Sequence, residues 1–245
     1  DARALSSFSS TQIEGNTLPL TDVKKILKSK PRNIQDTERE VLNYNKAMKT
    51  LDKRIKAKKI ETLSNKIICE IQGIVVDGLI DKSYSGTYRD APVFVNDPIK
   101  RRTIYLPPDS KDVKKLMTEL VEFVNSKKDA VDPLIIAGLF HKQMVIIHPF
   151  MDGNGRTTRL ITKTLLAELG INTFPLFSFE NYYNNNVTKY FEKVGVFGNY
   201  YEITEDINFT PWLEYFSEGI IHELNRVKSI FPQYQQRLDP QHKII

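Results

Sequence analysis

The sequence predicts an all-α protein, a bundle of helices interrupted by one small β-hairpin. Apolar residues recur at helical spacing through most of the chain, and Gly or Pro residues separate successive segments of this kind. β-prone residues gather in two short runs, 93–95 and 103–106, on either side of a turn-rich stretch at 96–98. With 245 residues the chain is long enough for one large domain, or for one domain with an appendage.

The helices follow from periodicity, and several of their starts follow from capping residues. Asp132-Pro133 and Thr210-Pro211 each combine a capping side chain with a proline at the first helical position. Residues 195–208 lack such a pattern and are expected to be irregular. Helices are expected at about 1–14, 23–29, 35–58, 62–76, 111–126, 133–147, in the segment after residue 155, at 178–194 and from residue 210 onwards.

Charge and cysteine content narrow the class of protein. The 35 basic residues exceed the 30 acidic ones by only five, and the basic clusters are spread over separate segments. We therefore expect solvated faces rather than a nucleic-acid-binding stripe. No twenty-residue apolar span and no signal peptide is visible, so neither membrane insertion nor secretion is expected. Cys69 is the single cysteine, which fits a buried thiol in a reducing, cytoplasmic setting.

The most informative stretch is 148–159, His-Pro-Phe-Met-Asp-Gly-Asn-Gly-Arg-Thr-Thr-Arg. Gly153, Asn154 and Gly155 favour a tight turn with free N–H groups, and the apolar pattern after them predicts a helix. The turn would then lie at a helix N-terminus, where unpaired N–H groups and the helix dipole favour an anion. Arg156 and Arg159 are three residues apart and share one face of that helix. Two guanidinium groups beside such a turn suit a polyphosphate.

Two more residues of this stretch can bind a metal ion or transfer a proton at the phosphate site. Asp152 can hold a divalent cation that bridges phosphate oxygens, and His148 is placed to take a proton. The stretch therefore predicts a nucleotide site with a base beside it. A plain helix N-terminus with surface arginines would explain the glycines and one arginine, but not His148 and Asp152 together with both arginines.

Residues 148–159 resemble the HxFx(D/E)GNGRxxR signature of the Fic family, whose members mostly transfer AMP from ATP to protein hydroxyl groups. The resemblance implies a Fic-fold helical bundle in which His148 takes the proton of the target hydroxyl. It also implies that Arg156 binds the β- and γ-phosphates of ATP and that Arg159 binds the γ-phosphate. The implied ligands of ATP and Mg²⁺ are Gly153, Asn154, Gly155, Arg156 and Arg159 for the phosphates and Asp152 for the metal.

A second motif lies near the start of the chain. Ser10-Thr-Gln-Ile-Glu14-Gly15 resembles the (S/T)xxxE(G/N) inhibitory motif of Fic proteins. The resemblance implies that Glu14 pairs with Arg159 and holds it away from the γ-phosphate, because a carboxylate and a phosphate compete for the same guanidinium. The alternative is a glutamate at a helix end that meets only water.

The stretch at 84–108 resembles the flap of Fic proteins. The resemblance implies that the backbone of Val93, Phe94, Val95 and Asn96 pairs with an extended segment of a target protein. Pairing of this kind depends little on side chains, so the identity of the target cannot be read from the flap. The alternative is a hairpin that is only structural.

Three aromatic or titratable residues outside these motifs are candidates for binding adenosine or a metal ion. The resemblance suggests that Tyr190 and Phe191 contact the adenosine of ATP, although their helix could equally serve packing alone. His141 lies seven residues before His148, a same-face spacing that would allow a metal pair. Because no third ligand lies at a suitable spacing, we interpret His141 as a hydrogen-bonded structural histidine.

We divide the chain into an N-terminal inhibitory region at 1–30, a Fic catalytic core with flanking helices at 31–232, and a short segment at 233–245. In that last segment Asp239-Pro240 resembles the opening of a first helix after a linker, and we expect the start of a truncated C-terminal winged-helix domain. A frayed tail is the alternative. DNA is expected as a partner only if such a domain exists.

The predicted function is that of a protein adenylyltransferase that uses ATP and Mg²⁺ and is inhibited by the pairing of Glu14 with Arg159. The resemblance favours AMP transfer, because the kinase-like branch of the family typically carries Lys where this chain has Gly155. Two alternatives stay open: removal of AMP by His148 and a water positioned by Glu14, or a regulatory nucleotide-binding module with a vestigial site. Self-modification and homo-oligomers are open as well.

Overall fold

The structure is a computed structural model that describes residues 2–29, 31–57, 62–96, 103–172, 174 and 178–238, with backbone only from residue 230 onwards. It is 67% helix and 4% strand, which confirms the predicted all-α class. The helices are α1 (Ala2–Ile13), α2 (Leu20–Lys28), α3 (Asp36–Lys56), α4 (Asn65–Val75), α5 (Ser110–Lys127), α6 (Pro133–Ile147), α7 (Asn154–Glu168), α8 (Phe179–Asn185), α9 (Val187–Val194), α10 (Tyr200–Ile203) and α11 (Thr210–Leu238). A 3-10 turn at Lys82–Tyr84 and the strands β1 (Val95–Asn96), β2 (Thr103–Leu106) and β3 (Gly198–Asn199) complete the order.

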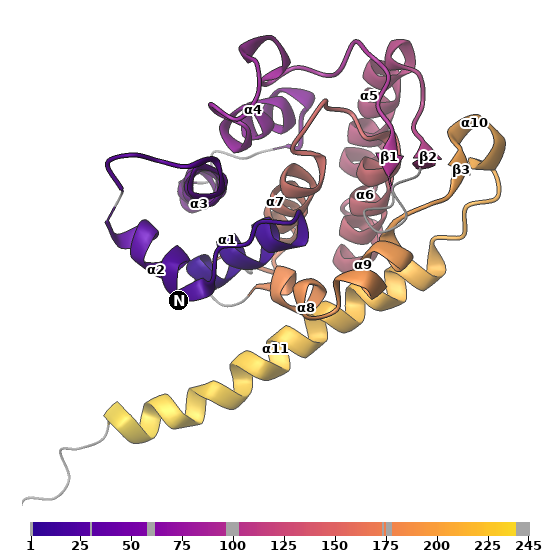
Figure 1. Cartoon of the computed structure of the whole chain (residues 1–245). Coiled ribbons are helices and arrows are strands. Elements are labelled where there is room, and N and C mark those ends of the chain that lie inside the picture. The colour runs from indigo at the N-terminus through magenta and orange to yellow at the C-terminus, as the bar shows by residue number, and fades with distance from the viewer. Residues whose placement is uncertain are drawn as a thin grey trace, which may run out of the picture.

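Helices α6 and α7 form the centre of the bundle (Figure 1). α6 is almost entirely apolar and buries Ile136, Phe140, Met144 and Ile147, so it can be covered on several sides at once. α5 and α11 pack on α6, while α3 and α4 pack on α7. The loop between α6 and α7 carries the stretch from His148 to Gly153, and the core therefore fixes both ends of the motif.

Helix α1 packs against α3, α7 and α8, close to the start of α7 (Figure 1). Its buried face is mostly polar, with Ala4 and Ile13 as the buried apolar residues. The other buried residues of this face are Ser6, Ser7, Ser9, Ser10 and Thr11. Such a face gains little from the hydrophobic effect, and its docking depends on hydrogen bonds to the core.

The predicted hairpin is present, and a third strand joins it. β1 and β2 are antiparallel, with Val95 opposite Tyr105, and β3 pairs with β2 in parallel. The strand order β1-β2-β3 leaves β1 at an outer edge. The expectation of an irregular segment at 195–208 was therefore wrong in part, since this segment holds β3 and the short α10. A two-residue strand has no detectable alternation, which is why the sequence pattern missed it.

The helix expected at 178–194 is in fact two helices, α8 and α9, that meet at Asn186. Asn186 adopts φ −144° and ψ 74°, and its side chain accepts a hydrogen bond from the backbone N–H of Lys189. An asparagine side chain that caps a helix competes with continuation of the preceding one. The apolar periodicity continues across this break, so periodicity alone could not locate it.

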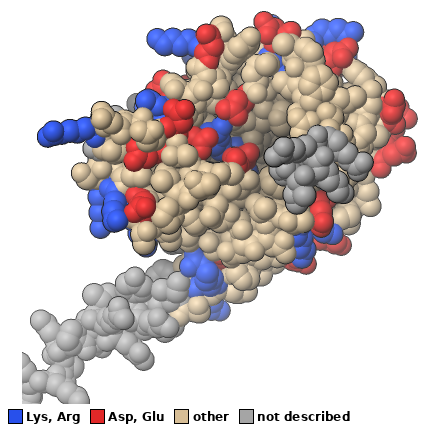
Figure 2. All heavy atoms as spheres, in the orientation of Figure 1, with Lys and Arg blue, Asp and Glu red and all other residues tan. Residues whose placement is uncertain are grey.

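Charged side chains of both signs lie on the face of the molecule that Figure 2 draws. Figure 2 shows Lys and Arg side chains interspersed with Asp and Glu. Among the residues whose structure is described, no helix is both long enough and apolar enough to cross a membrane. The last predicted boundary stays a prediction: α11 continues to Leu238, and residues 239–245, with the expected cap at Asp239-Pro240, lie outside the described ranges.

Candidate active site

His148 ends α6 in a left-handed conformation, with φ 49° and ψ 60°. In the described ranges it is the one non-glycine residue with positive φ, a conformation that costs energy and persists only where the surroundings enforce it. Its backbone N–H still donates to the carbonyl of Met144 at 3.1 Å. The turn ends α6 at the residue that the sequence predicts as the base.

Arg89 holds this turn in place from the start of the flap segment. Its Nε donates to the carbonyl of His148 at 2.8 Å and its Nη2 to the carbonyl of Ile147 at 3.4 Å. Nη2 also donates to the carbonyl of Pro108, at the end of the hairpin. The side chain is 3% exposed, and burial lowers its pKa. One planar guanidinium thus connects the turn at His148 with the hairpin segment.

The half-buried imidazole of His148 is arranged to accept a proton. Nδ1 lies 3.4 Å from the carbonyl of Val145, which can only accept, so Nδ1 carries the hydrogen and Nε2 keeps a free lone pair. Burial lowers the pKa of His148 to about 4. A neutral imidazole with a free Nε2 at physiological pH is the form that a general base requires.

The glycine turn after His148 is closed by Asn154. Its Oδ1 accepts from the N–H of Phe150 at 2.9 Å, and its Nδ2 donates to the Phe150 carbonyl at 2.8 Å. Gly153 has φ +79°, and a Cβ there would lie 2.8 Å from Cγ1 of Val76. No side chain of the described structure caps the start of α7 at Gly153. The first N–H groups of α7 therefore have no intrahelical acceptor and can receive an anion. The Asn154 side chain is already hydrogen-bonded to the backbone of Phe150.

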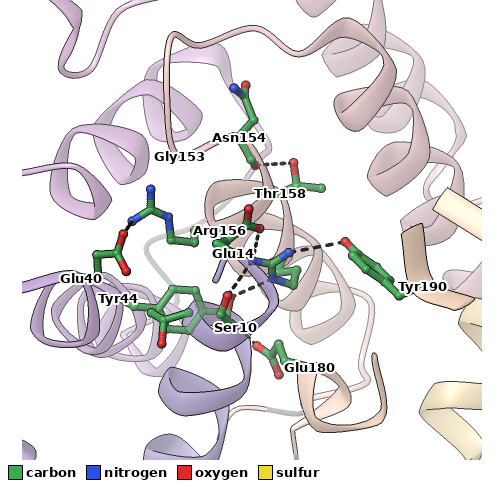
Figure 3. A network of polar contacts seen from close by, with 12 residues as sticks. Ser10, Glu14, Glu40, Tyr44, Gly153, Asn154, Arg156, Thr158, Glu180 and Tyr190 are labelled. Carbon is green, nitrogen blue, oxygen red and sulfur yellow. Dashed lines mark hydrogen bonds and ion pairs between the residues drawn. The ribbon is translucent and has the colours of Figure 1, made fainter. Parts of the chain in front are cut away.

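Arg156 is held by two carboxylates. Its Nη2 contacts both oxygens of Asp152 at 3.1 and 3.0 Å. Its Nη1 donates to Oε1 of Glu40 at 3.2 Å (Figure 3). Arg156 is 4% exposed, and its Nε is buried without a hydrogen-bond partner in the described structure. Asp152 Oδ1 also accepts from the N–H of Gly153 at 2.6 Å. The predicted metal ligand and one predicted phosphate ligand are therefore neighbours.

Arg159 is fully buried, and its guanidinium contacts Ser10 of α1 and Glu14, which follows α1 directly. Its Nη2 donates to Oε1 of Glu14 at 2.6 Å and to the carbonyl of Ser10 at 2.9 Å. Its Nε donates to Oγ of Ser10 at 2.8 Å. The structure thus brings together Ser10, Glu14 and Arg159. The pairing of Glu14 with Arg159 is the one that the resemblance implies, and the inhibitory role of Glu14 and Ser10 stays a prediction. Burial is the largest single influence and lowers the pKa of Arg159, but Glu14, together with Tyr190 and Tyr44, outweighs it, so the pKa of the guanidinium is raised.

Gly155 leaves the space that the carboxylate of Glu14 needs. A Cβ at this position would lie 2.2 Å from Glu14 Oε1 and 3.1 Å from Arg159 Nη1. No carbon and oxygen that are not bonded approach to the first of these distances, so any side chain here would displace Glu14. The third residue of the glycine turn therefore serves the contact with α1 as well as the turn.

The flap and adenosine candidates are placed as follows. Val95 and Asn96 form the edge strand β1, with Val93 and Phe94 just before it, and Phe94 is 57% exposed. Phe191 is 44% exposed. Tyr190 is 1% exposed, and its hydroxyl lies 3.5 Å from Nη1 of Arg159. Their assignment to adenosine stays a prediction, but Phe191 offers an accessible ring while Tyr190 faces the motif.

His141 is a structural histidine, as interpreted from the sequence. It is fully buried, with Nδ1 3.1 Å from Oγ1 of Thr162 and Nε2 3.1 Å from the hydroxyl of Tyr190. Both ring nitrogens are thus occupied. The described residues contain no group of three or more His, Cys, Asp or Glu side chains that could hold a metal ion.

Sequence reasoning missed four residues around the motif. Arg89 and Glu40 hold His148 and Arg156, and Lys163 and Glu180 form a fully buried ion pair at 3.0 Å behind Arg159. Ser6 of α1 joins that pair, because Nζ of Lys163 donates to its Oγ at 2.8 Å. Lys163 was detectable in principle, since it is a charged residue on the core face of an otherwise apolar helix stretch.

Together, these residues define a protein with an uncapped helix N-terminus, two buried arginines and a neutral histidine on a helical bundle. Residues 62–166 match the Fic/DOC family, and the chain therefore carries a Fic/DOC family domain.

Two relatives from other organisms bear the name protein adenylyltransferase Fic. The chain is 33% identical to the one from Nematostella vectensis over 167 residues, 66% of this chain and 37% of the relative. It is 33% identical to the one from Aedes aegypti over 168 residues, 66% of this chain and 32% of the relative. The chain thus spans about a third of the length of these curated relatives.

Solved structures show the same fold at low identity. A Fic family protein from Desulfovibrio desulfuricans superposes with a TM-score of 0.78 at 21% identity, covering 93% of this chain and 65% of that one. A Fic domain containing signaling protein from Bacteroides thetaiotaomicron gives 0.71 at 21% identity, covering 92% and 85%. Fic-1 from C. elegans gives 0.73 at 22% identity, covering 94% and 64%.

Proposed function

We propose that this chain is a protein adenylyltransferase, which transfers AMP from ATP to a Ser, Thr or Tyr hydroxyl of a protein. The observation that carries the proposal is the neutral, half-buried His148 placed next to the uncapped start of α7. A base beside an anion site suits attack of a hydroxyl on a phosphate. The relatives named protein adenylyltransferase Fic support the same reaction.

The triphosphate would lie on the first N–H groups of α7, with Arg156 on its β- and γ-phosphates and Arg159 on its γ-phosphate. Mg²⁺, when bound, neutralises phosphate charge and orients the pyrophosphate as a leaving group. Asp152 fits this role, because its carboxylate is half-exposed and one carboxylate plus phosphate oxygens is a common protein contribution to Mg²⁺. The turn and the arginines thus mainly bind and orient the triphosphate of ATP.

The chemical step follows from the position of His148. Nε2 takes the proton of the target hydroxyl while the hydroxyl oxygen forms a bond to the α-phosphorus. The bond between the α-phosphorus and the bridging oxygen to the β-phosphate breaks, and pyrophosphate leaves with the electron pair. Charge that develops on the phosphoryl oxygens would be stabilised by the N–H groups of α7.

We further propose that Glu14 inhibits this reaction. Its carboxylate occupies Nη2 of Arg159, the group that would hold the γ-phosphate. The carboxylate is tethered to the chain and therefore competes at a high effective concentration with the phosphate. The largely polar docking face of α1 supports a helix that can leave the site without exposing a large apolar surface.

Removal of AMP is the second candidate function. Glu14 keeps 30% of its side chain exposed beside the arginine pair, so its carboxylate can orient a water toward the same phosphorus. A vestigial regulatory site is the remaining alternative. The proposed partner for AMP transfer is a protein segment along the β1 edge, with self-modification as a special case.

Three further proposals concern the cellular compartment, DNA and the oligomeric state. We propose a reducing, cytoplasmic setting from the single free Cys69. DNA would be a partner only if a C-terminal winged-helix domain exists. A homo-oligomer is compatible with the proposal but is not required by it.

The test uses the full chain carrying Glu14→Gly, incubated with ATP labelled on either the α- or the γ-phosphate. The α-label should enter protein and the γ-label should not. Adding His148→Ala should abolish incorporation while ATP binding, measured by calorimetry, persists. Incorporation of the γ-label would show a kinase instead. If the chain binds ATP but neither label enters the chain itself or the proteins of a lysate, the vestigial site is favoured. If a protein that already carries AMP loses it faster with the unchanged chain than with Glu14→Gly, removal of AMP is favoured.

A further inference from the structure

A buried chain of hydrogen bonds leads from the interior of α7 to Arg159. Oγ1 of Thr162 lies 3.1 Å from Nδ1 of His141, and Nε2 of His141 lies 3.1 Å from the hydroxyl of Tyr190. That hydroxyl lies 3.5 Å from Nη1 of Arg159. The chain joins α7, α6 and α9 and returns to the arginine of the motif.

The direction of each bond follows from the donors available. The single hydroxyl hydrogen of Thr162 goes to the carbonyl of Thr158 at 2.8 Å, so Oγ1 accepts from Nδ1–H of His141. His141 is neutral, because burial lowers its pKa well below the usual value, and its Nε2 is therefore an acceptor. The Tyr190 hydroxyl donates to this nitrogen. Its oxygen lone pairs are left to face Nη1–H of Arg159.

The Tyr190 ring is fixed by its neighbours. Tyr183 stacks on it with ring centroids 4.8 Å apart and planes 23° apart, and Trp212 meets it edge-on at 6.0 Å. His141 in turn lies 4.9 Å from the Trp212 ring. Close packing on these sides leaves the hydroxyl one position, which is the one beside Arg159.

The hydrogen bonds of Arg159 divide into two groups. Nε and Nη2 bond to Ser10 and Glu14, both of which belong to the N-terminal segment that would leave on activation. Nη1 bonds to Tyr190, which belongs to the packed core. Within the described structure, Tyr190 is thus the partner of Arg159 that remains after α1 has gone.

We propose that Tyr190, fixed by His141 and Thr162, is a positioning residue that holds the Arg159 guanidinium ready for the γ-phosphate of ATP. The inference rests on the proposed function, in which Arg159 binds that phosphate. It gives Tyr190 a role different from contact with adenosine. The two roles differ in the part of the nucleotide that they affect, and nucleotides of different phosphate number separate them.

The experiment measures dissociation constants of ATP, ADP and AMP for the full chain with Glu14→Gly, with and without Tyr190→Phe. The parent should bind ATP more tightly than ADP. Tyr190→Phe keeps the ring and removes the hydroxyl, and it should lower this ATP-over-ADP ratio by about three- to tenfold, the effect of about one ordinary hydrogen bond. ADP and AMP affinities should stay within about twofold.

Tyr183→Phe is the matched control, because the Tyr183 hydroxyl is buried in the same cluster without a hydrogen-bond partner among the described residues. It should leave the ratio unchanged. Thr162→Val, at the far end of the chain, should lower the ratio in the same direction and by less. An unchanged ratio in both Tyr190→Phe and Thr162→Val would overturn the inference, as would an equal weakening of ATP, ADP and AMP, which would indicate an adenosine contact. A parent without any ATP preference would instead remove the γ-phosphate role of Arg159 itself, and with it both proposals.

Discussion

Glu14 Oε1 lies 2.6 Å from Nη2 of Arg159, and this ion pair joins two residues that are 145 positions apart. Arg159 is fully buried, whereas the Glu14 side chain is 30% exposed. A buried guanidinium requires an anionic partner, because an unpaired charge in the interior is costly. Either a carboxylate or a phosphate can meet that requirement. Inhibition and nucleotide binding are therefore proposed to share this one group.

Replacing Gly155 by alanine tests how closely Glu14 is fitted. Alanine is normally more stable than glycine in a helix, by about 0.5–1 kcal/mol. In the otherwise unchanged chain the Cβ would lie 2.2 Å from Glu14 Oε1, so we expect Gly155→Ala to lower the free energy of unfolding. In the Glu14→Gly background that obstacle is gone, and the same substitution should be neutral or stabilising. Urea unfolding of the unchanged chain, Gly155→Ala, Glu14→Gly and the double variant gives the coupling free energy between positions 14 and 155.

Equal effects of Gly155→Ala in the two backgrounds would mean that Glu14 does not occupy the space beside residue 155 in solution.

Arg89 should matter for catalysis more than for nucleotide binding. Arg89→Lys keeps a positive charge but cannot reach the carbonyls of Ile147, His148 and Pro108 together. His148 should then leave its left-handed conformation part of the time. We expect kcat for AMP transfer in the Glu14→Gly background to fall by about tenfold or more, since small displacements of a base have large effects. ATP affinity should change by less than about twofold.

The control for this comparison is Arg54→Lys, which alters a surface ion pair with Glu70. A drop in ATP affinity that matches the drop in kcat would show that Arg89 supports the fold of the whole site rather than the position of the base.

The titration of His148 gives a prediction about acid pH. Burial lowers its pKa to about 4, against about 6.5 for an unperturbed histidine. Between these values the unfolded chain binds a proton at His148 that the folded chain does not bind, so this residue makes the protein less stable as the pH falls through that window. An NMR titration of the four histidines, with His148 assigned from a His148→Asn spectrum, should show a midpoint near the lower value.

A midpoint of about 6.5 would show that the imidazole is solvated and that His148 is not neutral throughout the physiological range.

The buried pair of Lys163 and Glu180 should be important for stability and for the docking of α1. Both side chains are fully buried, 3.0 Å apart, and Ser6 of α1 bonds to both. Lys163→Met leaves Glu180 as an unpaired buried charge, and we expect a loss of about 3–5 kcal/mol in the free energy of unfolding. Adding Glu180→Gln should recover part of that loss. A double variant less stable than Lys163→Met would contradict the pairing.

How far the sequence could predict the site depends on how local each contact is. The glycine turn, His148, Asp152 and both arginines lie within twelve consecutive residues, so their association needed no tertiary information. The contact between Glu14 and Arg159 was expected only through a second motif. Arg89 could not be placed, because its contacts are backbone carbonyls, and any residue can supply a carbonyl.

The fold was predictable where apolar periodicity is long. α3, α5 and α6 lie within a few residues of the expected ranges. The break at Asn186 and the strand β3 could not be predicted, because each depends on one or two residues and on what surrounds them. The sequence pattern predicts that Glu40 lies on a solvent-exposed helix face. In the folded protein that face packs near Arg156, and Glu40 contacts the arginine. Tertiary contact, rather than pattern, decides such positions.

The most direct test of the account compares the unchanged chain with Glu14→Gly for incorporation of α-labelled AMP into protein at saturating ATP and Mg²⁺. Releasing Arg159 from a tethered carboxylate should raise the rate by about tenfold or more, and Arg159→Ala in the Glu14→Gly background should remove the gain. Equal rates for the unchanged chain and Glu14→Gly, with ATP bound to both, would contradict the claim that the Glu14–Arg159 pair controls the site.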